Sequence, residues 1–123
     1  MAIIKKLQRN TSNGEVYCTY EICNLLNQLD FKDRTESYYD TSKKLCSGTI
    51  FRSDQLPAPT LEHAVRWLRN VKNVHISMIY SYVKNEWASF INIYDEEKYY
   101  WREQYDFALA DCLIDVLQKL NER

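Results

Sequence analysis

The chain of 123 residues carries a formal net charge of −1, with 46% apolar and 27% charged residues. This length suits one domain with a core of its own, and this balance is typical of globular proteins. Neither half of the chain is strongly basic, which disfavours binding to the phosphate backbone of nucleic acids.

Aromatic residues are the unusual part of the composition, because the chain holds ten Tyr, three Trp and four Phe. Tyrosine combines a large apolar area with a hydroxyl group that needs a hydrogen-bond partner. An excess of tyrosine therefore suits either a half-buried sheet or a binding face.

The chain also indicates where the protein is expected to reside. No apolar run is long enough to span a membrane, and the segment MAIIKKLQRN lacks the long apolar stretch of a signal peptide. We therefore expect a cytoplasmic protein without membrane contact.

The spacing of the four cysteines, Cys18, Cys23, Cys46 and Cys112, includes no C-x-x-C motif, and the chain has only two histidines. Four cysteines could form two disulfides, but this compartment favours free thiols, and we expect neither metal nor cofactor.

The first half of the chain predicts one helix and some short strands. Residues 1–14 end in the turn cluster NTSNG and indicate a short strand or a loose arm. Thr19 is a suitable N-cap for a helix whose apolar residues recur at helical spacing. These residues are Ile22, Leu25, Leu26 and Leu29. Between residues 32 and 56, short strands at 38–39 and 45–51 around a turn at 41–44 compete with a long loop.

The second half predicts two helices around three strands. Pro57 and Pro59 mark a boundary, and Thr60 is a suitable N-cap for the helix that follows. Its apolar face takes Leu61, Ala64, Val65, Leu68 and Val71, with Trp67 beside it. Alternating patterns predict strands at 74–83, 87–94 and 98–102, with turns at 84–86 and 95–97. The last helix, 105–120, has one apolar stripe with Asp111 and Asp115 outside it, where we expect solvent. The stripe comprises Leu109, Cys112, Leu113, Val116, Leu117 and Leu120.

These elements predict a single α+β domain over residues 1–123. Residues 57–123 are expected to form a two-layer α-β-β-β-α unit, an antiparallel three-stranded meander flanked by two helices. Residues 1–56 are expected to add an N-terminal helix and a possible small hairpin.

Several motifs resemble a group of short uncharacterised proteins of Bacteroides-type gut bacteria and their phages. The matching segments span residues 18–120 and are A-P-T at 58–60, W-L-R at 67–69, N-V-H-I at 73–76, the 26–31 helix end and Tyr38-Tyr39. The closing helix opens Tyr105-Asp106-Phe107-Ala108, which lacks the cap and one acidic residue typical of that group. The resemblance implies a phage or mobile-element setting and no known activity.

No pattern in the chain predicts catalysis or metal binding. A Cys–His pair of Cys112 and His75 would need a thiolate within reach of the imidazole, but Cys112 lies on an apolar stripe. The acidic run at 95–97 falls in a predicted turn, where solvated charges are the default. The α-β-β-β-α order matches double-stranded RNA-binding domains, which place lysines at the start of the final helix. Here that position holds Tyr105 and Asp106.

A binding face is the remaining candidate. We expect the helices to cover Val74, Ile76, Met78, Tyr80, Trp87, Ile91 and Ile93. The opposite face would then carry His75, Ile79, Val83, Phe90, Tyr94, Tyr100 and Arg102. That is more apolar area than a monomer usually exposes, so either residues 1–56 or a partner should cover it.

These considerations lead to a functional hypothesis. The sequence favours a non-enzymatic accessory protein of a phage or mobile element that binds a host or element protein, or itself. The candidate binding residues are Phe90, Tyr94, Tyr100, Arg102 and His75. The alternative is a nucleic-acid or nucleotide-binding domain that stacks bases on the same aromatic face. An enzyme is the third possibility.

The acidic start of the last helix generates a first prediction. A phosphate-binding helix would be basic there, so we expect no tight binding to duplex RNA or DNA at physiological salt. A gel-shift titration with random-sequence duplexes measures this. Sub-micromolar binding that weakens steeply with added salt would favour the nucleic-acid alternative instead.

Overall fold

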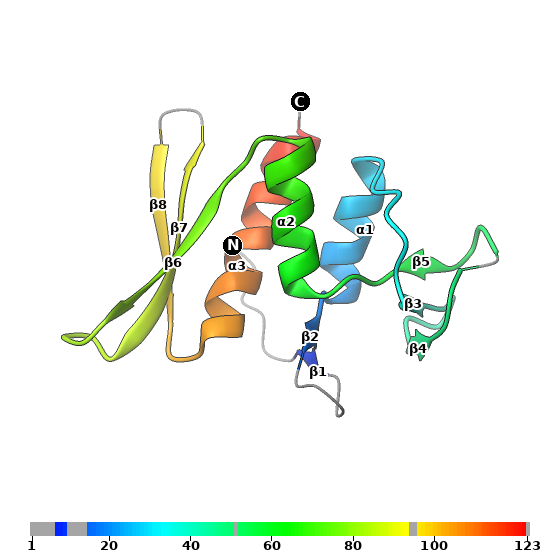
Figure 1. The fold of residues 1–123 in the computed structure, drawn as a ribbon, viewed down its shortest axis with the longest axis horizontal. Coiled ribbons are helices and arrows are strands. Elements are labelled where there is room, and N and C mark those ends of the chain that lie inside the picture. Colours follow the sequence, from blue (N-terminus) through cyan, green and yellow to red (C-terminus); the bar gives the residue numbers. More distant parts are fainter. Residues whose placement is uncertain (1–6, 10–14, 51, 94–95, 123) are drawn as a thin grey trace.

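The computed structural model describes residues 7–9, 15–50, 52–93 and 96–122 (Figure 1). Within these ranges the chain forms three helices, a two-stranded pairing and two antiparallel three-stranded sheets. The predicted α+β class is confirmed. No helix in the described ranges is long and apolar enough to cross a membrane.

Helix α1, Tyr20–Gln28, follows the short pairing of β1 (Gln8–Arg9) with β2 (Val16–Tyr17). Thr19 caps the helix as predicted, because its Oγ1 accepts the Ile22 N–H at 3.3 Å. The helix ends where Asp30 adopts a left-handed conformation, φ 65°. The Phe31 N–H then donates to the Leu26 carbonyl at 3.1 Å, which satisfies a carbonyl at the helix end.

A small sheet follows, with β3 (Ser37–Tyr39) between β4 (Leu45–Ser47) and β5 (Leu56–Pro57). The structure therefore contains the predicted hairpin, although β4 is shorter than expected. Strand β5 was not predicted, because Pro57 argues against a strand; β5 lies at the edge of the sheet, where proline is tolerated. The buried Tyr39 hydroxyl donates to the Cys18 carbonyl at 2.7 Å and ties this sheet to the start of α1.

Helix α2, Leu61–Val71, confirms the second predicted N-cap. The Thr60 Oγ1 accepts the His63 N–H at 3.2 Å. Asn73 takes a left-handed conformation, φ 55°, and the Val74 N–H donates to the Leu68 carbonyl at 3.1 Å, which ends the helix. Most of the predicted apolar face is buried or half-buried, but Val71, the last helical residue, is exposed.

The larger sheet contains β6 (Ile76–Ser81), β7 (Glu86–Ile93) and β8 (Glu96–Arg102) in that order, with antiparallel neighbours. Ser81 pairs with Glu86 across a four-residue loop, in which Asn85 has φ 57° and its N–H donates to the Ser81 carbonyl at 2.8 Å. Strand β7 ends at Ile93, which pairs with Glu96. Both connections between the strands thus begin earlier than the sequence predicts. This difference decides which side chains of β8 face the helices.

Helix α3, Tyr105–Asn121, lies at the centre of the molecule (Figure 1). It packs against β7 and β8 as well as against α1 and α2. Residues 108–114 are all buried, as expected for a helix with neighbours on every side. We expected both helices of residues 57–123 to cover the sheet. In the structure α3 lies directly against the sheet, α2 contacts α3, and α1 packs on the side of α3 away from the sheet.

The carboxylates of α3 also correct the sequence-based expectation that they face solvent. Asp111 is only 3% exposed and accepts from the Arg102 guanidinium at 2.7 Å. Asp115 is half-buried, accepts from the Tyr100 hydroxyl, and lies 3.7 Å from the Lys98 ammonium. The helix therefore binds the sheet through paired polar side chains as well as through its apolar residues.

The buried ion pair generates a stability prediction. Replacing Arg102 by Met should cost about 3 kcal/mol of unfolding free energy, because Asp111 stays buried without its guanidinium partner. Adding Asp111→Asn should recover part of that loss. Denaturant unfolding measures both variants.

The matched control is Arg66→Met on the exposed surface of α2, which should change stability by less than about 0.5 kcal/mol. An equally small effect of Arg102→Met would contradict the role given to the pair.

Candidate functional site

The candidate site is the face of the larger sheet that points away from α3, here called the open face. Side chains alternate along each strand, so residues two apart share a face. Those that contact α3 include Ser89, whose hydroxyl donates to the Ala108 carbonyl at 2.7 Å. The open face therefore takes Ser77, Ile79, Ser81, Glu86, Ala88, Phe90, Glu97, Tyr99 and Trp101. In Figure 1 all three helices lie on the opposite side of this sheet.

Three aromatic rings form a continuous row on the open face, here called the aromatic ladder. The Phe90 and Tyr99 rings lie 4.9 Å apart between centroids, at 38° to each other. The Tyr99 and Trp101 rings are stacked at 6.2 Å and 13°. Tyr99 is 49% exposed, and Ile79 on β6 is 43% exposed. The open face thus presents aromatic and aliphatic side chains to solvent.

The predicted binding residues are divided between the two faces of the sheet. Phe90 lies on the open face as expected, and His75 is exposed just before β6, with its Nε2 3.2 Å from the Asn73 Oδ1. Tyr94 lies outside the described residues. The placement of Tyr100 and Arg102 on the open face is wrong, because both point to α3.

The error in β8 has a specific cause. A turn at 95–97 would pair Tyr94 with Lys98 and set Tyr100 opposite Asn92, on the same face as Phe90. In the structure Ile93 pairs with Glu96, so Tyr100 lies opposite Ser89. The expected and the observed pairing of β8 with β7 differ by three residues, and any odd shift in register moves every side chain of a strand to the other face. Tyr99 and Trp101 were missed for this reason, and only an earlier turn would have identified them.

The loop between β6 and β7 extends this surface. Tyr82 is 91% exposed and Val83 is 97% exposed, so two apolar side chains stand at the tip of a hairpin that projects from the molecule (Figure 1). The Tyr82 ring packs edge-on against Tyr80 at 5.1 Å. From the same loop, the Lys84 ammonium lies 4.1 Å from the centre of the Trp101 ring, a cation–π contact that joins the tip to the aromatic ladder.

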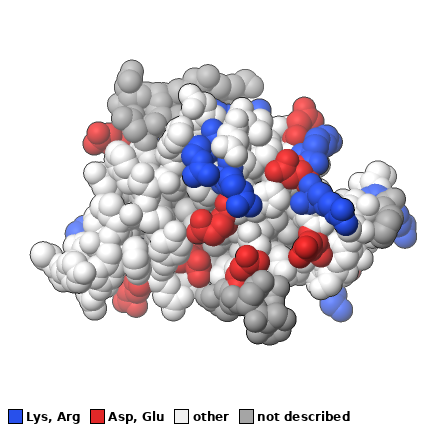
Figure 2. Space-filling view, in the orientation of Figure 1, with Lys and Arg blue, Asp and Glu red and all other residues white. Residues whose placement is uncertain are grey.

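Charge on and around the open face is sparse and partly acidic. Glu86 lies at the end of the face nearest the projecting loop, and Glu97 lies at the opposite end. Figure 2 shows Lys and Arg intermingled with Asp and Glu over the helices, and mostly uncharged surface along the edge of the sheet that faces the viewer. Neither region visible in that view forms a continuous basic patch of the kind that binds phosphate.

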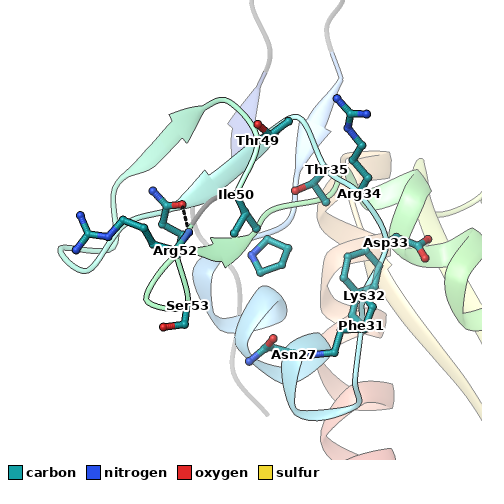
Figure 3. A pocket seen from close by; sticks show the side chains of 12 residues that line it. Asn27, Phe31, Lys32, Asp33, Arg34, Thr35, Thr49, Ile50, Arg52 and Ser53 are labelled. Carbon is teal, nitrogen blue, oxygen red and sulfur yellow. Dashed lines mark hydrogen bonds between the residues drawn. The ribbon is translucent and has the colours of Figure 1, made fainter.

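A second candidate is a cavity of about 690 Å³ beside the end of α1 and the small sheet (Figure 3). Phe31, Ile50 and Pro57 form its apolar part, while the Arg34 and Arg52 side chains point away from it. Asp33 is held on the α2 side, 2.9 Å from the His63 Nε2. Polar side chains such as Asn27, Lys32 and Thr49 complete the lining. Every buried side-chain polar atom of the described residues has a partner, so no buried orphan group points to a particular ligand here.

The thiols of the core are unsuited to nucleophilic chemistry. Cys112 has no exposed area, and burial raises the pKa of its thiol to about 12. Burial also raises the pKa of Cys23, whose thiol donates to the Cys18 carbonyl at 3.8 Å. A protonated thiol is a poor nucleophile and a poor metal ligand. In the described part of the chain, no cluster of His, Cys, Asp and Glu could hold a metal ion.

Comparison of the chain with protein-family models, with curated proteins and with solved structures finds no match. The candidate site is therefore defined by its own geometry.

The burial of the thiols generates a reactivity prediction. At pH 8.5 the native protein should react with iodoacetamide only at Cys46, which is half-buried, because Cys18, Cys23 and Cys112 are buried. The raised pKa values of Cys23 and Cys112 keep these two thiols protonated at that pH. Mass spectrometry counts the modified sites. The denatured, unreduced chain should show four, and rapid native modification of Cys112 would contradict its placement in the core.

Proposed function

We propose that this protein is a non-enzymatic binding protein that contacts a partner protein through the open face of its larger sheet. The observation that carries the proposal is the aromatic ladder, which stands on a face that no described helix covers. Exposed apolar surface of this kind, bordered by polar residues, is typical of protein interaction sites. Aromatic side chains also dominate the binding energy of protein interfaces.

The same face suits nucleic acid less well. A base-stacking surface needs free ring faces and basic residues to follow the phosphates. Here Tyr99 and Trp101 stack on each other, and Lys84 already lies over the Trp101 ring. The carboxylates Glu86 and Glu97 would repel a phosphate backbone. A partner protein therefore fits the chemistry of the face better than the nucleic-acid or nucleotide alternative.

The biological setting of the proposal comes from the sequence. The motifs between residues 18 and 120 resemble short proteins of gut-bacterial phages and mobile elements. This resemblance supports an accessory role in such an element, with a host or element protein as partner, in the cytoplasm.

Two neighbouring tyrosines on β8 provide a matched test. Tyr100 is 6% exposed on the helix-covered face, and Tyr99 is 49% exposed on the open face. Tyr100→Ser should lower the unfolding free energy by about 3–5 kcal/mol, the usual cost of truncating a buried aromatic residue. Tyr99→Ser should lower it by less than about 1 kcal/mol. Thermal or denaturant unfolding compares the two.

The functional half of the test uses the same stable variant. Affinity purification of Tyr99→Ser, alone and combined with Trp101→Ser, should lose a partner protein that the wild type and Arg66→Met both retain. The proposal fails if the folded open-face variants keep every partner. It also fails if the retained component is nucleic acid that nuclease treatment removes.

A further inference from the structure

The shape and charge of the open face indicate what kind of partner segment it binds. We infer that its occupant is an amphipathic α-helix of a partner protein, with an apolar stripe and basic residues near both ends. This inference rests on the proposed function and adds the class of ligand.

The area of the face argues against a second copy of this chain as a stable partner. Three strands at about 4.8 Å spacing and about 7 residues each at 3.4 Å cover roughly 350 Å². Two such faces together would bury about 700 Å², whereas stable interfaces bury about 1,200–2,000 Å². A single helix buries a similar area here and therefore suits a weak or transient contact, and its width of about 10 Å with side chains fits within the roughly 14 Å across the three strands.

The relief of the face also favours a cylinder. Large side chains stand along β8, where Tyr99 and Trp101 form a wall. The neighbouring strands contribute the small residues Ser77 and Ser81 as the floor, while Ala88 is already fully covered by its neighbours. A helix laid along the floor would contact the wall with its side, while Ile79 and Phe90 contact the stripe from below. A helix on this face would mirror α3 and give the sheet a layer on both sides, a common protein architecture.

The carboxylates set the polarity of the occupant. Glu86 and Glu97 lie at opposite ends of the open face, six residue positions apart along the strands, which is about 20 Å. An α-helix covers that distance in about 13 residues. Lysine or arginine at both ends of such a stretch would pair with the two carboxylates. An acidic residue would be repelled at the Glu97 end, whereas at the Glu86 end it would also meet the Lys84 ammonium over the Trp101 ring.

A randomised 16-residue peptide library displayed on phage tests this inference with the intact chain as bait. Peptides are selected on the wild type and counter-selected on the Tyr99→Ser, Trp101→Ser double variant. We expect survivors with apolar residues at i, i+3, i+4 and i+7 and with Lys or Arg near both ends. Their synthetic forms should bind the double variant about 30-fold more weakly, as for the loss of a hot spot.

Charge reversal supplies the independent readout. Glu86→Lys with Glu97→Lys should weaken binding of the selected peptides and strengthen binding of analogues in which Glu replaces the terminal Lys or Arg. Selected peptides whose apolar residues alternate every second position, as in a strand, or that contain Pro or acidic ends, would overturn the helix inference while leaving the proposed function intact. Failure to recover any peptide that depends on Tyr99 and Trp101 would overturn both, as would binding of an oligothymidine alone to the open face.

Discussion

The contact between the carboxylates of α3 and the side chains of β8 governs the rest of this structure. Asp111 lies almost wholly out of solvent, and a carboxylate in that position is costly unless a cation meets it. The Arg102 guanidinium meets it at 2.7 Å, while Asp115 accepts from the Tyr100 hydroxyl and lies 3.7 Å from the Lys98 ammonium. Because side chains alternate, holding Lys98, Tyr100 and Arg102 on the helix side places the residues between them on the other side. The polar pairs inside the protein thus determine the aromatic surface outside it.

The large number of aromatic residues has two explanations that apply together. Some rings belong to the architecture, such as Phe31 and Trp67 at 5.3 Å, or Trp87 and Tyr105 at 5.1 Å. The sequence left open whether the whole excess was structural or functional. The structure shows that internal contacts account for one part of it, and that Tyr82, Tyr99 and their neighbours account for an exposed part. Only this exposed part can act in binding without unfolding the chain.

Local signals were sufficient to predict much of the fold. Thr19 and Thr60 cap helices where the sequence places the caps, because an N-cap depends on one side chain and the amide it accepts from. The face of the sheet to which each β8 side chain points was not predictable in this way. It depends on the register set by the preceding turn, and any odd shift in register exchanges the two faces. The burial of Asp111 was also missed. A charged residue beside an apolar stripe is usually exposed, and the sequence does not show that β8 packs on this side of α3 and places Arg102 against the carboxylate.

The central claim is that the β7–β8 register directs Tyr99 and Trp101 away from the helices. The most direct test is a solution NMR measurement of nuclear Overhauser effects between aromatic side chains of the intact protein. The account predicts a strong contact between the Phe90 and Tyr99 rings, whose centroids are 4.9 Å apart, and contacts from Tyr100 to α3 near Asp115. A contact between Phe90 and Tyr100, with Tyr99 against α3, would show the opposite register and contradict the account.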